Sequence, residues 1–148
     1  MIAYFDSSAA VPLLVEDEPG ASACRRVWAT ADAVVASRVL YVEVAAALAR
    51  AERLGRLTAP AHQAARAGLD VIWAQVDVVE VTDTLVRRAA QLARDQSLRG
   101  FDALHYAAAL SLAGPTTVAL AGDAALLRAW RATGLDVIDT STGELGSA

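Results

Sequence analysis

Short apolar runs alternate with longer Ala- and Leu-rich segments of helical periodicity along almost the whole sequence, and this alternation most constrains the fold. The expected strands are residues 2–5, 33–36, 76–81, 117–120 and 136–138. The expected helices are one that begins just after Asp6 and others over about 20–31, 37–54, 58–74, 83–96, 102–113 and 124–133. Strands separated by helices pair in parallel, so we predict an α/β fold, a three-layer α/β/α sandwich with a central parallel sheet of four to five strands.

The chain is long enough for one domain only. Its 148 residues fall within the usual size of a single domain, and 55% of them are apolar, which excludes a disordered chain. We therefore expect a single domain over residues 1–148, with residues 140–148 as a flexible tail.

The sequence favours a cytoplasmic protein that does not enter the membrane. The longest uncharged stretch, residues 103–122, is interrupted by the turn residues 114–117, so it predicts a helix and a strand rather than a membrane span. The N-terminus has no basic residue before its apolar part and contains Asp6, which does not fit a signal peptide. A single cysteine, Cys24, forms no internal disulfide, in agreement with a reducing compartment.

All thirteen basic residues are arginine, against seventeen acids. The net charge of −4 argues against a protein that coats nucleic acids nonspecifically. The absence of lysine excludes Schiff-base chemistry and the phosphate-binding lysine of P-loop proteins.

Acidic residues gather where the carboxyl ends of parallel strands are expected. Asp6 and Asp123 each follow a predicted strand, and Asp102 begins a predicted helix. For each of the three, taken alone, helix capping is the simpler explanation. Glu43 differs, because it lies inside an apolar helix, where a carboxylate needs a partner. That partner is either an arginine or a divalent cation.

A divalent cation accounts for all four acids together. Clustered carboxylates repel one another until a hard cation such as Mg²⁺ or Mn²⁺ neutralises them. A cation of this kind activates water and supports phosphodiester hydrolysis, which requires no lysine, cysteine or catalytic histidine.

Four segments, IAYFDSSAAV, SRVLYVEVAAALARA, LRGFDALHYAAAL and AGDAALLRA, resemble in order and spacing a PIN-domain protein of the VapC toxin type. The resemblance covers residues 2–138. It implies a PIN-like α/β/α sandwich, Mg²⁺- or Mn²⁺-dependent endoribonuclease activity, a VapB-like antitoxin partner, an RNA substrate and a homodimer.

The resemblance also assigns the site residues. The catalytic acids are Asp6, Glu43, Asp102 and Asp123, the metal ligands among them are Asp6, Asp102 and Asp123, and Ser8 is the supporting hydroxyl of a D-x-S pattern. The chain departs from the family before the fourth acid: the family often has Thr or Ser two residues before it, whereas Ala121 and Gly122 precede Asp123 here.

Other reactive or aromatic residues have framework interpretations. His105, three residues after Asp102, is assigned to the framework rather than to the metal, because Mg²⁺ prefers oxygen ligands. His62 is expected on the surface and Cys24 as a buried thiol. The tryptophans are expected in the core, and the arginine pairs and clusters either flank the site or cover solvated helix faces; these residues are Trp28, Trp73, Trp130, Arg25, Arg26, Arg50, Arg53, Arg56, Arg87 and Arg88.

Two other functions compete with the ribonuclease. A phosphatase with an aspartate nucleophile is disfavoured, because Ser8 stands where the second acid of a DxD start would be. A catalytically inactive PIN-like protein-binding module remains open, with acids that only cap helices and arginines that bind a protein partner.

Overall fold

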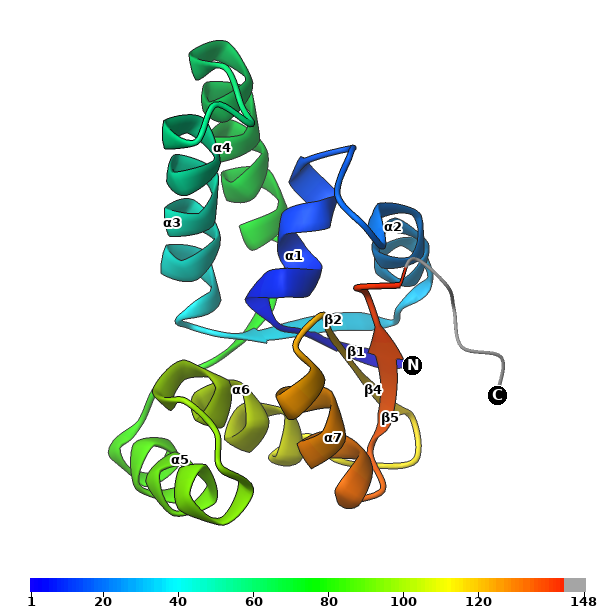
Figure 1. Cartoon of the computed structure of the whole chain (residues 1–148). Helices are drawn as coiled ribbons and strands as arrows, with labels where there is room; N and C mark the ends of the chain where they lie inside the picture. The colour runs from blue at the N-terminus through cyan, green and yellow to red at the C-terminus, as the bar shows by residue number, and fades with distance from the viewer. Residues whose placement is uncertain (143–148) are drawn as a thin grey trace.

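A computed structural model describes residues 1–142 and contains one five-stranded parallel sheet in the order β3-β2-β1-β4-β5 (Figure 1). The strands are β1 (Ile2–Phe5), β2 (Ala33–Ser37), β3 (Asp77–Val79), β4 (Thr117–Ala121) and β5 (Asp136–Asp139). Helices alternate with these strands along the chain, which confirms the predicted parallel sheet.

Seven helices cover the two faces of the sheet within the described residues (Figure 1). On one face lie α1 (Ser7–Leu14), α2 (Ala21–Thr30), α3 (Leu40–Arg53) and α4 (Ala59–Trp73). On the other lie α5 (Asp83–Gln96), α6 (Gly100–Leu110) and α7 (Ala124–Ala132). The predicted three-layer sandwich is therefore confirmed.

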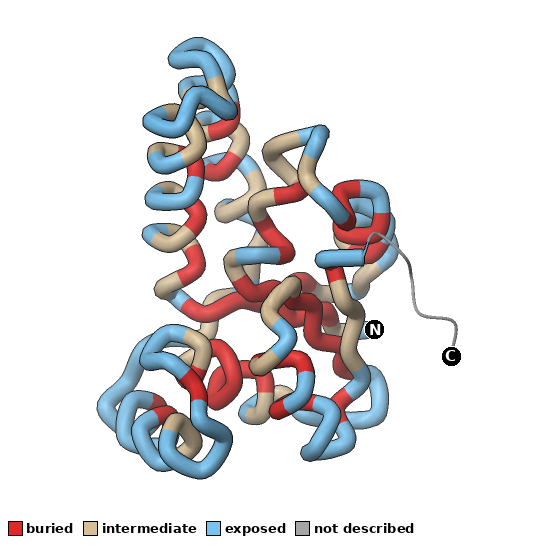
Figure 2. Tube along the Cα trace, viewed as in Figure 1, coloured by how far each residue is buried: buried red, intermediate tan, exposed pale blue. Residues whose placement is uncertain are grey.

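Side chains of β1 point alternately into the two halves of the core. Tyr4 packs against α6 and α7, where it meets the fully buried Trp130, whereas Ala3 and Phe5 pack on the side of α1 to α4. Figure 2 shows the buried backbone concentrated in the sheet and the helix turns that face it. Among residues 1–142, no helix has both the length and the apolar character needed to cross a membrane.

Several element boundaries differ from the sequence prediction. Ser37 ends β2 instead of opening a helix, because it pairs with Val79 across the sheet, and α3 starts only at Leu40. The third strand is shorter than residues 76–81. Helix α6 begins at Gly100 rather than Asp102, directly after its N-cap residue Arg99.

The predicted tail is wrong at its first residue. Thr140 is buried, and its N–H donates a hydrogen bond to the Ala121 carbonyl at 2.9 Å. Gly20 adopts a φ of 75°, and a Cβ there would lie 2.2 Å from the Thr140 carbonyl oxygen, so only glycine fits this contact. The rest of the predicted tail from residue 143 onward lies outside the described residues.

Candidate active site

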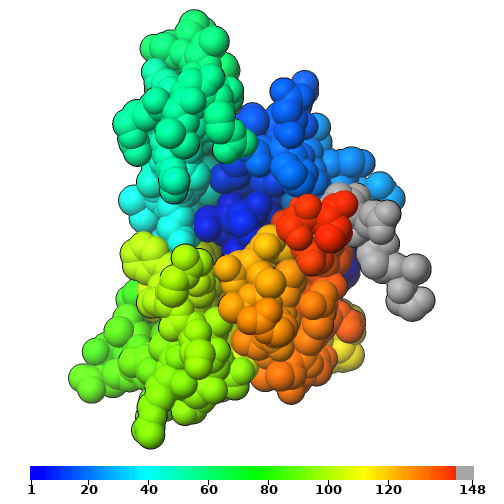
Figure 3. All heavy atoms as spheres, viewed as in Figure 1, coloured from blue at the N-terminus to red at the C-terminus, as the bar shows by residue number. Residues whose placement is uncertain are grey.

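The four predicted acids come from different elements at the carboxyl edge of the sheet. Asp6 directly follows β1, and Asp123 follows β4 after one intervening residue, while Glu43 and Asp102 lie in the first turns of α3 and α6. Figure 3 shows the start of α1 (blue) surrounded on this face by α3 (cyan), the α5–α6 region (yellow-green) and α7 (orange). Parallel pairing of β1 with β4 brings the ends of these two strands together, as expected for such a fold.

Asp6 is a buried carboxylate with a raised pKa. Its Oδ1 accepts hydrogen bonds from the Ser8 hydroxyl at 2.7 Å and from the Ala9 N–H at 2.9 Å, and it caps α1. The side chain is only 4% exposed, and this burial raises the pKa of Asp6 to about 6. His105 and the two hydrogen bonds oppose the increase, whereas the charge of Glu43 adds to it.

Ser8 connects Asp6 to the end of β4. Its hydroxyl donates to Asp6 and accepts the Gly122 N–H at 2.7 Å. A Cβ at Gly122 would lie 3.4 Å from both the Ser8 and Thr140 hydroxyl oxygens. Hydroxyls from α1 and from the residue after β5 therefore lie beside the backbone just before Asp123.

Glu43 pairs with a histidine rather than with an arginine. Its Oε2 lies 2.6 Å from His105 Nε2, with 17% of the Glu43 side chain exposed and 1% of the His105 side chain exposed. The sequence analysis considered only an arginine or a cation as the partner of Glu43 and placed His105 in the framework. His105 is indeed buried, but it also holds a site carboxylate, a contact that sequence spacing does not reveal.

One arginine bridges the other two acids. Arg99 Nε donates to Asp102 Oδ2 at 2.8 Å, and its Nη2 lies 3.5 Å from Asp123 Oδ2. The hydrogen bond to Asp102, together with the charges of both carboxylates, raises the pKa of Arg99. Sequence analysis missed Arg99, although its position three residues before Asp102 places both on one helix turn.

Helix capping explains two of the four acids. Asp6 caps α1, and Asp123 caps α7 by accepting the Leu126 N–H at 2.9 Å. Asp102 does not cap α6, since Arg99 occupies the N-cap position, and Glu43 lies inside α3. Capping alone therefore leaves Glu43 and Asp102 without an explanation.

The oxygen atoms of these side chains are the kind of ligand that a hard cation prefers. Within residues 1–142, no group of three or more His, Cys, Asp or Glu side chains is close enough to enclose a metal ion. Asp102 and Asp123 nevertheless both contact the Arg99 guanidinium, which supplies one positive charge for two carboxylates. Burial also removes solvent from the ionised Asp6 carboxylate. Oxygen donors of this type match Mg²⁺ or Mn²⁺. The ligand set Asp6, Asp102 and Asp123 stays a prediction.

Sequence comparison finds close relatives over nearly the whole chain. A family model described as "PIN domain" matches residues 3–140. The chain is 40% identical over 136 residues to Ribonuclease VapC45 and equally to Ribonuclease VapC49, both of Mycobacterium tuberculosis, covering 92% of this chain and 94% of each relative.

Solved structures share the fold at lower sequence identity. PAE2754 of Pyrobaculum aerophilum has a TM-score of 0.70 at 21% identity, covering 96% of this chain and 91% of that one. VapC20 of M. tuberculosis, described as a sarcin-ricin loop cleaving toxin, has a TM-score of 0.66 at 23% identity, covering 86% and 94%. VapBC2 of Rickettsia felis, described as bound to a promoter DNA fragment, has a TM-score of 0.64 at 9% identity, covering 94% and 98%.

Proposed function

Because the chain belongs to the PIN-domain family, we propose that it is a metal-dependent endoribonuclease of the VapC toxin type. The two relatives at 40% identity are named ribonucleases, and they align with this chain over nearly all of their length. A structural relative, VapC20, is described as a sarcin-ricin loop cleaving toxin. These names support RNA as the substrate class.

The buried Asp6 carboxylate is the observation that carries the proposal. It lies at the carboxyl edge of the sheet, interacts electrostatically with Glu43 and His105, and is linked through Ser8 to the strand end that precedes Asp123. A helix cap works equally well at an exposed position, whereas a buried carboxylate is stabilised in its ionised form by a bound cation.

Each side chain of the candidate site has its own role in the proposed hydrolysis. Asp6, Asp102 and Asp123 would hold Mg²⁺ or Mn²⁺, and the bound cation supplies charge neutralisation at the phosphate and a more acidic water. Glu43 would accept the proton of the attacking water, whose oxygen forms a bond to phosphorus while the bond from phosphorus to the leaving ribose oxygen breaks. The leaving ribose oxygen would take a proton from solvent water. Ser8 fixes the Asp6 carboxylate through its hydrogen bond.

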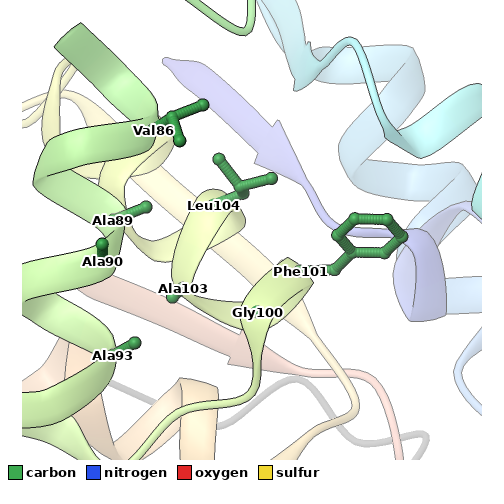
Figure 4. Close-up of a pocket in the computed structure, with 8 residues that line it drawn as sticks. All are labelled: Val86, Ala89, Ala90, Ala93, Gly100, Phe101, Ala103 and Leu104. Carbon is green, nitrogen blue, oxygen red and sulfur yellow. The ribbon is translucent and has the colours of Figure 1, made fainter. Parts of the chain in front are cut away.

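A VapB-like antitoxin and a homodimer complete the proposal. Structural relatives described as VapBC assemblies, among them the R. felis protein, support the antitoxin. For the homodimer, an apolar hollow of about 240 Å³ lies between α5 and α6 (Figure 4). Val86 and Phe101 at this hollow are 44% and 52% exposed, which supports α5 and α6 as the contact surface between two copies.

The inactive binding module is the second candidate, favoured by the caps that Asp6 and Asp123 provide. One experiment separates it from the nuclease. Purified protein, separated from any co-expressed partner, is incubated with RNA and Mn²⁺, in parallel with Asp6→Asn and with Asp95→Asn, which changes an exposed carboxylate on α5. We expect cleavage by the wild type and Asp95→Asn, and loss of cleavage in Asp6→Asn or with EDTA. Cleavage that survives EDTA and Asp6→Asn refutes the proposed mechanism, and no cleavage under any condition favours the binding module.

A further inference from the structure

His105 joins two side chains that are distant in the sequence. Its Nδ1 lies 2.9 Å from the Tyr4 hydroxyl of β1, and its Nε2 lies 2.6 Å from Glu43 Oε2 of α3. The imidazole is 1% exposed, and Tyr4 is fully buried. These contacts form a continuous chain of hydrogen bonds from the core to the candidate site.

Aromatic packing fixes the inner end of this chain. The Tyr4 ring meets the His105 ring edge-on, with centroids 6.1 Å apart and an interplanar angle of 72°. On another side, Tyr4 meets the ring of the buried Trp130 at 6.0 Å and 76°. Such contacts leave the phenol little freedom to rotate away from His105.

The surroundings also set the direction of the hydrogen bonds. Burial, with a smaller contribution from the Asp6 carboxylate, raises the pKa of Tyr4, so the phenol keeps its proton. An ionised carboxylate only accepts, so the contact of Glu43 Oε2 with the imidazole requires a proton on Nε2 of His105. In the neutral imidazole with this proton, Nδ1 accepts from the Tyr4 hydroxyl.

We propose that Tyr4 and His105 are positioning residues that orient the Glu43 carboxylate for proton transfer. His105 holds Oε2 and leaves Oε1 to receive the proton of the attacking water. The Glu43 side chain keeps 17% of its surface exposed, so it contacts solvent while its partner is buried. This role rests on the proposed function, because it acts through Glu43 and requires no contact between His105 and RNA.

A matched pair of substitutions tests the contact to Glu43. The amide nitrogen of glutamine lies as many bonds from the backbone as Nε2 of histidine, whereas that of asparagine matches Nδ1. We expect His105→Asn to lower kcat for RNA cleavage about 10- to 100-fold with KM unchanged, the range typical of residues that orient catalytic ligands. His105→Gln is expected to recover most of this loss, and His62→Gln serves as the control. Equal losses in His105→Asn and His105→Gln, or a wild-type kcat in His105→Asn, overturn the proposal.

A double substitution tests whether His105 acts through Glu43. In the Glu43→Gln background, His105→Asn is expected to cause no further loss of kcat, because the orienting contact has no carboxylate left to serve. Tyr4→Phe removes only the phenol oxygen and is expected to lower kcat less than His105→Asn does. A full additional loss from His105→Asn in the Glu43→Gln protein would show that His105 acts independently.

Nitrogen-15 NMR of the imidazoles in metal-free protein provides a readout that does not depend on activity. The chain has two histidines, so His62→Gln identifies the His105 signals. We expect a proton on Nε2 of His105, and a change in the Nδ1 signal in Tyr4→Phe. Absence of RNA cleavage by the wild type would refute the proposed function, whereas cleavage by a protein whose His105 carries its proton on Nδ1 alone would refute only the positioning role.

Discussion

Replacing Asp6 by asparagine is expected to stabilise the metal-free protein at neutral pH while abolishing its proposed activity. The carboxylate is 4% exposed, and burial raises its pKa from 3.8 to about 6. Both hydrogen bonds recorded for the side chain end on Oδ1. An asparagine amide oxygen accepts the same two bonds, so the substitution removes the buried charge and keeps the cap.

The sign of the pH dependence follows from proton binding. Between about pH 4 and pH 6 the native state binds more protons at Asp6 than the unfolded chain does, so stability falls as the pH rises through this window. At about 1.4 kcal/mol for each pKa unit, the penalty reaches about 3 kcal/mol at pH 7. Asp6→Asn does not ionise, so its advantage over the wild type is absent near pH 4 and about 3 kcal/mol at pH 7.

Urea unfolding in EDTA buffers at several pH values measures this difference. Asp95→Asn, on the exposed side of α5, is the control and is expected to stay within about 0.5 kcal/mol of the wild type at every pH. An Asp6→Asn protein no more stable than the wild type at pH 7 would refute the reasoning. A stability difference that does not change between pH 4 and pH 7 would also refute it.

Three further changes have defined outcomes. Saturating Mn²⁺ is expected to raise the Tm of the wild type but not of Asp6→Asn in a thermal-shift assay, and equal shifts would contradict a role for Asp6 in metal binding. Arg99→Gln removes the cation that Asp102 and Asp123 share, so Mn²⁺ is expected to bind about 10-fold more tightly by calorimetry; unchanged or weaker affinity would contradict competition by the guanidinium. Burial raises the pKa of Cys24 to about 11, so iodoacetamide at pH 8 is expected to modify the thiol only in urea, and rapid labelling of the folded protein would contradict this.

Local sequence signals are sufficient for most of the fold. Residues 2–5 are apolar and end at Asp6, and the structure has a strand there followed by a capped helix. Thr82 directly precedes the helix predicted over 83–96, and its side chain caps that helix by accepting the Leu85 N–H. Such features depend on neighbours within four residues, and the prediction works because propensity, capping and periodicity agree.

The contacts of the candidate site depend on tertiary structure, and sequence spacing does not reveal them. Glu43 and His105 are 62 positions apart, and they meet only because α3 and α6 both start at the carboxyl edge of the sheet. Its place near the end of the chain puts Thr140 in the predicted tail, yet its N–H donates to the carbonyl of Ala121, the last β4 residue paired with β5. In both cases the partner belongs to another element, so the neighbouring residues in the sequence do not predict the contact.

Asp6 shows why the candidate site is more than a set of helix caps. An aspartate N-cap stabilises a helix by about 1 kcal/mol, whereas the desolvated charge of Asp6 at pH 7 opposes folding by about 3 kcal/mol. A neutral asparagine at the same position would cap α1 without that penalty. Selection for stability alone therefore does not account for an aspartate here, but a bound cation would offset the penalty by stabilising the ionised form. The energetic defect of the metal-free protein at Asp6 thus supports the same cation site that the sequence predicts.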